Sequence, residues 1–325
     1  MLDQEQVAEP VVRRRNPLVT GLLVVIAVPF VVLVLLRLLG IDGNRYTAAA
    51  LALVPYATVG GLLLGVVALV LRRWKTGALV LLLAGALVLT LLPRMSADEQ
   101  PAVNGRPLKV MAANLYFSQA DPATVVRLVR DNGVEVLTLL ELSPQGEAAL
   151  EKAGLFTLLP HRVSKAAAAG AGSAVVSKYP LTEAPLAGPS ALKQPGARVE
   201  FGDGTGVEIV AVHPLPPVES MDDWRTTLKG LPKPTGDLPV RILAGDFNAT
   251  LDHEVFRDVL DGGYADAADE RGMGLSATWP EGLFPPPVTL DHILVDDRVA
   301  VRDFKVFELP NGDHSAVYAE LTVPV

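Results

Sequence analysis

Several apolar, strand-like stretches in the second part of this chain end on residues that can do acid–base or metal chemistry. The run LKVMAAN ends at Asn114, VEVLTLLE ends at Glu141, and GVEIVAVH ends at His213. In PVRILAGDFN, VTLDHILV and GDHSAVYAELTV the polar residues stand at the end, centre or start: Asp246 and Asn248, Asp291 and His292, Asp313 and His314. Strand ends in layered α/β folds face a common rim, so these runs predict one site rather than unrelated turns.

The charges of these residues indicate the chemistry of the site. If Glu141, Asp246, Asp291 and Asp313 share one rim, two carboxylates about 4 Å apart repel by roughly 4 kcal/mol at an effective dielectric of about 20. Proton sharing or a bound cation relieves this repulsion. Carboxylate and amide oxygens in a chain without cysteine favour Mg²⁺ or Mn²⁺ over zinc. With a water-orienting Asp and phosphate-binding histidines, such a cation predicts phosphoryl hydrolysis.

The stretch LAGDFNATLDH contains the clearest pair of site candidates. Its bland interpretation is a turn, because Asp and Asn hydrogen-bond their own backbone and Gly tolerates a positive φ. Residues two apart in a strand point the same way, so Asp246 and Asn248 can also act together. Gly245 beside them allows backbone or substrate to approach closely.

The elements that position these residues alternate between strands and helices. DPATVVRLVRDNG predicts a helix with Asp121 as its N-cap, Pro122 at its first position and Gly133 just past its end. Apolar runs over residues 108–114, 134–141 and 206–213 predict strands. We therefore expect a mixed α/β (α+β) domain over residues 108–325.

The first 95 residues concentrate the apolar character of the chain, which is 50% hydrophobic overall. Three apolar runs, about 17–39, 47–71 and 76–93, are each close to the roughly 20 residues that cross a bilayer as a helix. We expect a membrane anchor of three transmembrane helices. A cleaved signal peptide is the alternative for the first run, but the run is long for one and two more spans follow it.

The basic residues predict the orientation of this anchor. Arg13, Arg14 and Arg15 precede the first span, and Arg72, Arg73 and Lys75 lie between the second and third. The positive-inside rule then places residues 1–16 in the cytoplasm and everything after the third span outside the membrane. Residues 94–107 are polar and turn-rich, which indicates a linker.

The charge of the outer part argues against one function class. Residues 104–325 hold 19 Lys and Arg against 30 Asp and Glu, a net charge of −11 with histidine neutral. Domains that grip long polyanions are normally basic. A processive nuclease is therefore disfavoured.

Together, the motifs Asn114, Glu141, GSAVVSKYP, VHP, GDFNAT, TWP, LDHILV and DHSAV resemble the endonuclease/exonuclease/phosphatase superfamily, which has the deoxyribonuclease-I-like fold. The resemblance runs in order from about residue 108 to 325, and its anchored form is similar to membrane-anchored members common in actinobacteria. It implies a four-layer α/β/β/α sandwich, with two packed β-sheets flanked by helices.

The resemblance also implies roles for individual residues. Glu141 matches the family's metal-binding Glu, Asn114 the Asn beside it, and Asp313 a further carboxylate on the metal side. Leu140 stands where the family usually has Gln, which removes one amide near the metal.

The other matched residues act on water and phosphate. Asp246 matches the Asp that orients or deprotonates the attacking water, and Asn248 the Asn that contacts the phosphate. His213 and His314 match the two phosphate-contacting histidines, and Asp291 matches the carboxylate partner of His314.

Five further side chains stay outside this set. His253 starts a predicted helix and is expected at the surface, while His161 has no constellation around it. His292 either faces the site or packs beside Asp291. Trp279, like Tyr116, either lines the pocket or belongs to the core.

We expect a membrane-anchored, extracytoplasmic phosphoesterase that uses Mg²⁺ or Mn²⁺. A metal-dependent DNA or RNA nuclease is the alternative, and a non-catalytic binding module is a weaker one because the charged set is intact. The expected partners are the bilayer and a phosphoester substrate: a nucleotide, nucleic acid, lipid headgroup or inositol phosphate. No protein partner is implied.

Overall fold

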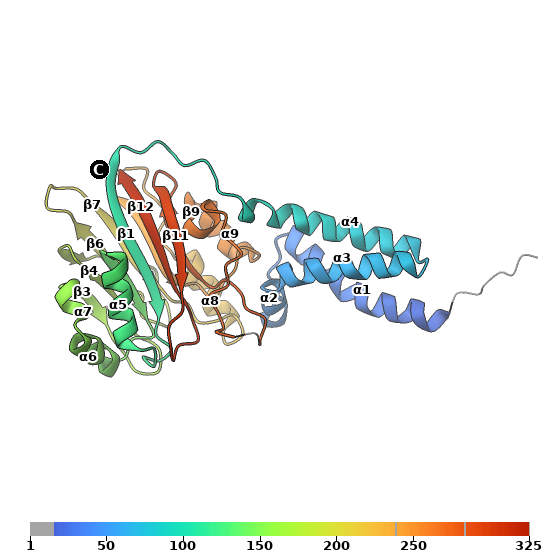
Figure 1. Cartoon of the computed structure of the whole chain (residues 1–325), viewed down its shortest axis with the longest axis horizontal. Helices are drawn as coiled ribbons and strands as arrows, with labels where there is room; N and C mark the ends of the chain where they lie inside the picture. Colours follow the sequence, from blue (N-terminus) through green and yellow to red (C-terminus); the bar gives the residue numbers. More distant parts are fainter. Residues whose placement is uncertain (1–15, 238, 283, 325) are drawn as a thin grey trace, which may run out of the picture.

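The computed structural model describes residues 16–237, 239–282 and 284–324. A β-sandwich forms one part, and a bundle of apolar helices projects from its side (Figure 1). Of the predicted cytoplasmic segment, residues 1–15, with Arg13, Arg14 and Arg15, lie outside the described residues.

The first sheet has six strands in the order β11-β12-β1-β2-β4-β3. Their bounds are β1 Gly105–Asn114, β2 Val136–Leu140, β3 His161–Lys165, β4 Ser173–Ser177, β11 Ala300–Phe307 and β12 Ala316–Pro324. β1 begins three residues before the predicted strand, inside the segment that we expected to be a linker. Helices α5 (Pro122–Asn132), α6 (Pro144–Ala153) and α7 (Leu155–Leu158) pack on the outer face.

The second sheet also has six strands, in the order β5-β6-β7-β8-β10-β9. Their bounds are β5 Leu181–Glu183, β6 Gly196–Glu200, β7 Gly206–Val212, β8 Val240–Asp246, β9 Tyr264–Asp266 and β10 Asp291–Asp296. Helices α8 (Met221–Lys229) and α9 (Glu254–Leu260) cover its outer face, and α10 (Ala267–Glu270) packs near the sheet interface.

The side chains alternate between two cores, as the pleat of a strand requires. In β1, Val110 and Ala112 pack between the sheets against residues such as Ile242. Met111 and Ala113 point the other way, into the core beneath α5 and α6. The expected α/β sandwich with two packed sheets and flanking helices is confirmed.

The N-terminal helices are α1 (Pro17–Leu38), α2 (Arg45–Leu51), α3 (Val54–Val70) and α4 (Trp74–Leu91), followed by the 3₁₀ turn η1 (Pro93–Met95). By length and composition, α1 and α4 can each cross a membrane. The predicted span 47–71 is not one helix, because α2 and α3 are bent by 72° at a short break. The described residues therefore contain two clear membrane-crossing candidates, or up to three if the bent pair counts as one.

The long helices pack closely and leave apolar side chains on their outer surfaces. A Cβ on Gly61 would lie 2.4 Å from the Phe30 ring, so the glycine permits α1 and α3 to approach. Leu22, Leu63 and Leu82 are 62%, 63% and 71% exposed. Helices that are apolar all round are typical of membranes.

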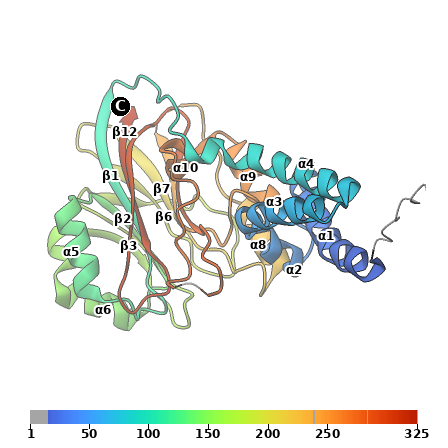
Figure 2. The same ribbon diagram turned by 45° about the vertical axis from the view of Figure 1, so that its right-hand side comes forward.

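The helices and the sandwich meet in a polar junction on the side of the sandwich seen in Figure 2. Asp252, after β8, accepts hydrogen bonds from Arg37 Nε at 2.7 Å and from Arg94 Nη2 at 2.7 Å. The carboxylate of Asp42 caps α9 by accepting from the backbone N–H groups of Glu254 and Val255. Arg94 is buried, although the sequence placed it in a linker.

Candidate active site

The predicted site residues meet at one end of the two sheets. Asn114 ends β1, Asp246 ends β8, and Glu141 and His213 directly follow β2 and β7. β1 is parallel to β2 and β7 to β8, so these carboxyl ends share an edge. The antiparallel strands β10 and β12 bring three more residues there at or just before their starts: Asp291, Asp313 and His314.

Asp246 lies at the centre of this cluster and is buried. Its Oδ2 accepts a hydrogen bond from Asn114 Nδ2 at 3.1 Å. Nδ2 of Asn248 lies 3.5 Å from the same oxygen. The Nε2 atoms of His314 and His213 lie 3.6 Å and 3.9 Å from it. One carboxylate oxygen thus faces nitrogen atoms from four other predicted site residues.

His314 is the charged histidine of the site. Its Nδ1 lies 2.8 Å from Asp291 Oδ2. Burial opposes the charged ring, but Asp291 and Asp246 outweigh burial and raise the pKa of His314 to about 10. At neutral pH, His314 therefore donates from Nδ1 to Asp291 and presents a second N–H toward Asp246.

His213 is the neutral histidine. Burial lowers its pKa to about 4, and the nearby carboxylate of Asp246 offsets this only in part. Its backbone N–H donates to Gln194 Oε1 at 3.0 Å, which holds the residue at the end of β7. A neutral imidazole still donates from one nitrogen, so the two histidines differ in charge but not in their ability to bind an oxygen.

Glu141 reaches the cluster from the first sheet. Its Oε1 accepts from Asn114 Nδ2 at 3.1 Å and lies 3.9 Å from His213 Nε2, while Oε2 accepts from the backbone N–H of Phe117 at 2.8 Å. Burial raises the pKa of this carboxyl. Asn114 links Glu141 to Asp246 through its amide nitrogen, and its oxygen accepts from Tyr116 N at 3.0 Å.

The turn after β8 accounts for LAGDFNATLDH. The backbone N–H of Asn248 donates to Asp246 Oδ1 at 2.8 Å, which is an Asx-type turn, and its Nδ2 donates to Pro214 O at 3.1 Å. The turn interpretation is confirmed. Asn248 lies past the end of β8 with a positive φ, so the expected pairing of Asp246 and Asn248 on one face of a strand is wrong, and it is the turn that brings the two side chains together. A Cβ on Gly245 would lie 2.2 Å from Val212 O, so the close approach at this glycine is by the backbone of β7.

Unusual backbone conformations gather at this end of the sheets. Phe117, Glu141, Ala169 and Asn248 are non-glycine residues with positive φ that line one cavity. Such conformations persist only where the surrounding structure holds them, and they concentrate at functional sites. Ala169 belongs to the KAAAAGAG segment, which the sequence connected with the rim by position alone.

Asp313 and Trp279 form the far wall. Trp279 Nε1 donates to Asp313 Oδ2 at 3.3 Å, so this tryptophan lines the cavity. Phe117 also lines it, whereas Tyr116 does not. Phe117 was not among the site residues predicted from the sequence. Its position three residues after Asn114 was the signal that could have placed it near the site.

Two histidines have structural positions that the sequence did not predict. His253 is buried rather than at the surface. Its Nδ1 accepts from Thr250 N at 2.9 Å, and its Nε2 lies 2.9 Å from Ala48 O in α2. His292 turns away from Asp246 and binds Asp266 Oδ2 at 2.6 Å, so it supports the sheet rather than the site. His161 begins β3, away from the cluster.

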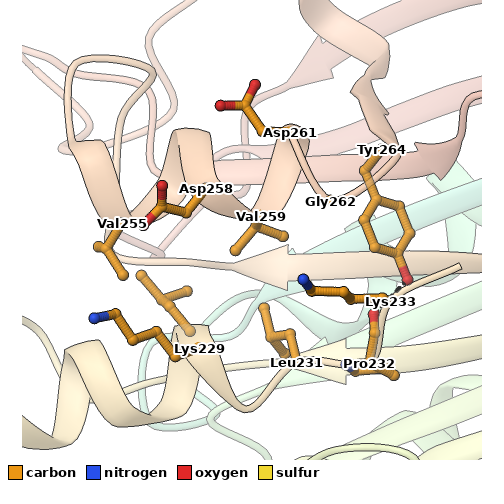
Figure 3. Close-up of a pocket in the computed structure, with 11 residues that line it drawn as sticks. Lys229, Leu231, Pro232, Lys233, Val255, Asp258, Val259, Asp261, Gly262 and Tyr264 are labelled. Atoms are coloured by element: carbon orange, nitrogen blue, oxygen red, sulfur yellow. Dashed lines mark hydrogen bonds between the residues drawn. The ribbon is translucent and has the colours of Figure 1, made fainter. Parts of the chain in front are cut away.

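The site residues line a cavity of about 560 Å³. Another cavity, of about 430 Å³, lies between α8 and α9 (Figure 3). Lys229, Lys233, Asp258 and Tyr264 line it, together with aliphatic side chains. None of the predicted site residues is among its lining residues, so the first cavity is the candidate active site.

The profile of the endonuclease/exonuclease/phosphatase family matches residues 111–314, which is well over half of the chain. The chain belongs to the endonuclease/exonuclease/phosphatase family. It is therefore a hydrolase of the phosphoester-cleaving type, in agreement with the chemistry of the cluster.

Solved structures of this family share the fold of the sandwich. The family protein from Leptotrichia buccalis matches at 14% identity with a TM-score of 0.52, covering 66% of this chain and 99% of that one. TDP2 from D. rerio, complexed with a single-strand DNA product, matches at 15% identity with a TM-score of 0.54, covering 67% and 99%. TDP2 from C. elegans matches at 17% identity with a TM-score of 0.52, covering 69% of this chain and 77% of that one. No curated protein sequence matches the chain.

The donor set of the endonuclease/exonuclease/phosphatase site is compatible with a hard divalent cation, which this family generally uses. Burial raises the pKa of Glu141 and of Asp246, so negative charge at both is poorly compensated. One carboxylate oxygen each of Asp291 and Asp313 is buried without a hydrogen-bond partner among the described residues. Ligand atoms of Asp246, Asp291 and His314 also lie within 4.8 Å of one another, but the positive charge of His314 accounts for this cluster without an ion.

Proposed function

We propose that this protein is a membrane-anchored, extracytoplasmic phosphoesterase that depends on a divalent metal and cleaves a phosphodiester or phosphomonoester by in-line attack of water. The observation that carries the proposal is the buried Asp246, whose Oδ2 faces nitrogens of Asn114, Asn248, His213 and His314 at 3.1–3.9 Å. This arrangement provides a base for water beside donors for phosphoryl oxygens.

Each residue has a defined part in the proposed reaction. Asp246 accepts a proton from the attacking water and orients its lone pair toward phosphorus. Asn248 and His213 donate to non-bridging phosphoryl oxygens. His314 does the same with its positive charge, and Asp291 positions its ring by accepting from Nδ1.

The metal side of the site is proposed to be Glu141, Asp313 and Asn114, with Mg²⁺ or Mn²⁺ as the ion. When bound there, the ion supplies Lewis-acid stabilisation of negative charge on the phosphoryl and leaving oxygens. Asn114 takes part as a metal ligand only if its amide reverses, because its oxygen now accepts from Tyr116 N.

We expect metal removal to abolish activity. Hydrolysis of bis(p-nitrophenyl) phosphate by the full chain in detergent should fall at least about 100-fold in EDTA and return with Mg²⁺ or Mn²⁺, because the charges on Glu141 and Asp246 are otherwise uncompensated. Released p-nitrophenolate is the readout. Turnover that is the same with and without EDTA would rule out the metal dependence.

The three-pass anchor is a further part of the proposal. Arg73 Nη2 donates to Asn16 O, so the start of α1 and the α3–α4 turn lie at one end of the bundle. Arg37 and Arg94 meet Asp252 at the other end, beside the sandwich. The basic residues Arg72, Arg73 and Lys75 therefore lie opposite the sandwich, which supports an extracytoplasmic domain by the positive-inside rule.

The orientation predicts the outcome of a reporter fusion. An enzyme that matures only outside the membrane, fused after Val325, should be active, whereas one that works only in the cytoplasm should be silent in the same position. The reverse pattern would overturn the three-pass anchor.

A nuclease is the second candidate, and the D. rerio TDP2 complex with a DNA product favours it by fold alone. The cavity argues against it, since none of the described residues that line it is Lys or Arg. A non-catalytic module is the weakest reading, because the charged set is complete.

A further inference from the structure

The cavity over Asp246 is not built from the sandwich alone. Ala48, Ala49, Ala52 and Leu53, from α2 and the bend into α3, line the same cavity as the catalytic cluster. Residues separated by about 200 positions in the sequence thus line the same cavity. Part of the apolar N-terminal region is a wall of the active site.

Specific contacts hold α2 in this position. His253 Nε2 lies 2.9 Å from Ala48 O, and His253 itself lines the cavity. The carboxylate of Asp42 caps α9, and Arg225 Nη2 donates to Gly43 O at 2.7 Å. The α2 wall is therefore attached to the sandwich at several points by hydrogen bonds.

The remaining walls are also apolar. They come from two proline-rich loops of the sandwich and nearby residues: Leu215, Pro216, Pro217, Val218, Pro285, Pro286, Val288 and Leu290. The reactive groups lie together at one end: Glu141, His213, Asp246, Asn248, Asp313 and His314. Glu219, next to Val218, and His253, against α2, also line the cavity. The cavity thus has a reactive polar end, and its sides are mostly apolar.

Large exposed apolar side chains in the sandwich mark the same region. Within the described part of 108–325, those more than a third exposed are Phe117 at 53%, Val218 at 50% and Phe284 at 90%. Phe117 and Val218 line the cavity, and Phe284 directly precedes Pro285, which also lines it. Exposed apolar side chains that gather at one place indicate a binding surface rather than chance exposure.

The cavity also lies at the level where the apolar helices end. α2 is bent 72° from α3, and Tyr56, near the start of α3, donates from its hydroxyl to Pro287 O at 2.8 Å. Tyrosine at this position is typical of a membrane–water interface. The cavity therefore lies beside the expected surface of the bilayer, since α2, which lines it, lies between the sandwich and the long helices (Figure 1).

We infer that the substrate is a phosphoester of a membrane lipid, whose phosphate lies on the Asp246 cluster while its glycerol and first acyl carbons lie between α2 and the two proline-rich loops. This inference rests on the proposed function of the same site. A nucleic acid does not suit the cavity, since a strand of phosphates requires Lys or Arg along its path, and the part of the lining that the structure describes contains neither.

The reaction is a hydrolysis and needs no further reactant. The oxygen of water forms a bond to phosphorus, and one phosphorus–oxygen ester bond breaks. Asp246 takes one proton from the water and later releases it to solvent, and the leaving alkoxide takes one proton from solvent water to become an alcohol. The products are a phosphate monoester, or free phosphate from a monoester, and the alcohol that carried it.

The test uses the full chain reconstituted in vesicles of phosphatidylcholine, phosphatidylethanolamine and phosphatidylglycerol, with Mg²⁺ or Mn²⁺. The same protein is given the deacylated glycerophosphodiesters, bis(p-nitrophenyl) phosphate and a single-stranded oligonucleotide. We expect at least one lipid to be cleaved with a kcat/KM at least tenfold above that of its deacylated counterpart, measured by mass spectrometry of the products.

Matched variants test the α2 wall. Ala49→Glu places a charge in the apolar part of the cavity and should lower the ratio of lipid to soluble-ester turnover at least tenfold. Ala50→Glu, the same change on a neighbour that does not line the cavity, should leave that ratio unchanged. Val218→Glu places a charge on the sandwich side of the same cavity and should lower the ratio to a similar extent. It provides the test if Ala49→Glu disrupts α2 itself.

The failures of the two proposals are distinguishable. If soluble esters or the oligonucleotide are cleaved as well as or better than every lipid, the lipid inference is overturned and the phosphoesterase stands. If Ala49→Glu and Val218→Glu leave the ratio unaltered, the apolar walls are not the lipid site. Absence of metal-dependent turnover on all substrates overturns both proposals.

Discussion

Replacing Asp246 with Asn should lower kcat for phosphoester hydrolysis by about 1,000-fold, the scale at which general-base catalysis contributes. Asn cannot take a proton from water. Its amide nitrogen would also face Asn114 Nδ2, which now donates to Asp246 Oδ2 at 3.1 Å. Hydrolysis of bis(p-nitrophenyl) phosphate by the full chain is the measurement.

The same variant should leave the thermal stability of the metal-free protein close to that of wild type, because removal of a buried charge offsets the loss of the hydrogen bond from Asn114 Nδ2. Burial raises the pKa of Asp246, so the folded state binds its proton more tightly than the unfolded state does. Above both pKa values, the charged carboxylate therefore destabilises the fold, and a neutral Asn removes that effect. Loss of activity with a retained melting temperature separates a catalytic role from a structural one.

Asp258→Asn is the control, because Asp258 is an exposed carboxylate on α9 of the same domain. It should keep wild-type turnover. If Asp246→Asn retains turnover within a few-fold of wild type, Asp246 is not the base and the proposed mechanism fails.

Replacing Asp252 with Ala should destabilise the intact chain by about 3–5 kcal/mol, the range for removal of one partner from a buried ion pair. The Asp252 side chain is 1% exposed, and those of Arg94 and Arg37 are 6% and 10% exposed. Removing the carboxylate leaves two guanidinium groups without their partner at the junction of the helices and the sandwich. Thermal unfolding in detergent is the measurement.

The ion pair also predicts the direction of a pH effect. Burial opposes the charge on Asp252, but Arg94 and Arg37 outweigh it and lower the pKa of the carboxyl. A depressed pKa contributes stability above the unfolded value of about 4, and that contribution is lost as the pH falls through the folded pKa. The difference in free energy of unfolding between wild type and Asp252→Ala should therefore become smaller as the pH is lowered.

The exposed Asp258 is again the matched position, and Asp258→Ala should change stability by no more than about 0.5 kcal/mol. Equal melting temperatures for Asp252→Ala and wild type at neutral pH would mean that the junction does not stabilise the chain. The attachment of α2 beside the cavity would then depend on its other contacts.

Much of the proposed catalytic cluster was predictable from the sequence. Asn114, Glu141, His213 and Asp246 each stand at or directly after the end of an apolar strand, and parallel strands bring such ends to one edge. This pattern is local, so it can be recognised without knowing how the strands pack. The family resemblance added the roles, and the structure brings these residues within hydrogen-bonding or near-contact distance of one another.

Charge states and amide orientations were not predictable. His213 and His314 look alike in the sequence, but the pKa of one is lowered to about 4 and that of the other is raised to about 10. The difference arises because Asp291 binds His314 directly, whereas the ring of His213 is buried without such a partner. Partners of this kind come from distant parts of the chain.

The sequence by itself determined a mixed α/β domain, the strand ends that hold the polar groups, and the apolar character of the first 95 residues, because periodicity and hydropathy are local properties; the sandwich of two sheets was implied only by the family resemblance. Only the tertiary structure decided that α2 is bent by 72° from α3 and that His253 is buried under α2. The break itself stands at Pro55, in the first turn of α3, which is a local signal. The burial of His253 follows from contacts between segments about 200 residues apart. Those contacts also place α2 against the site, which no local pattern in either segment could indicate.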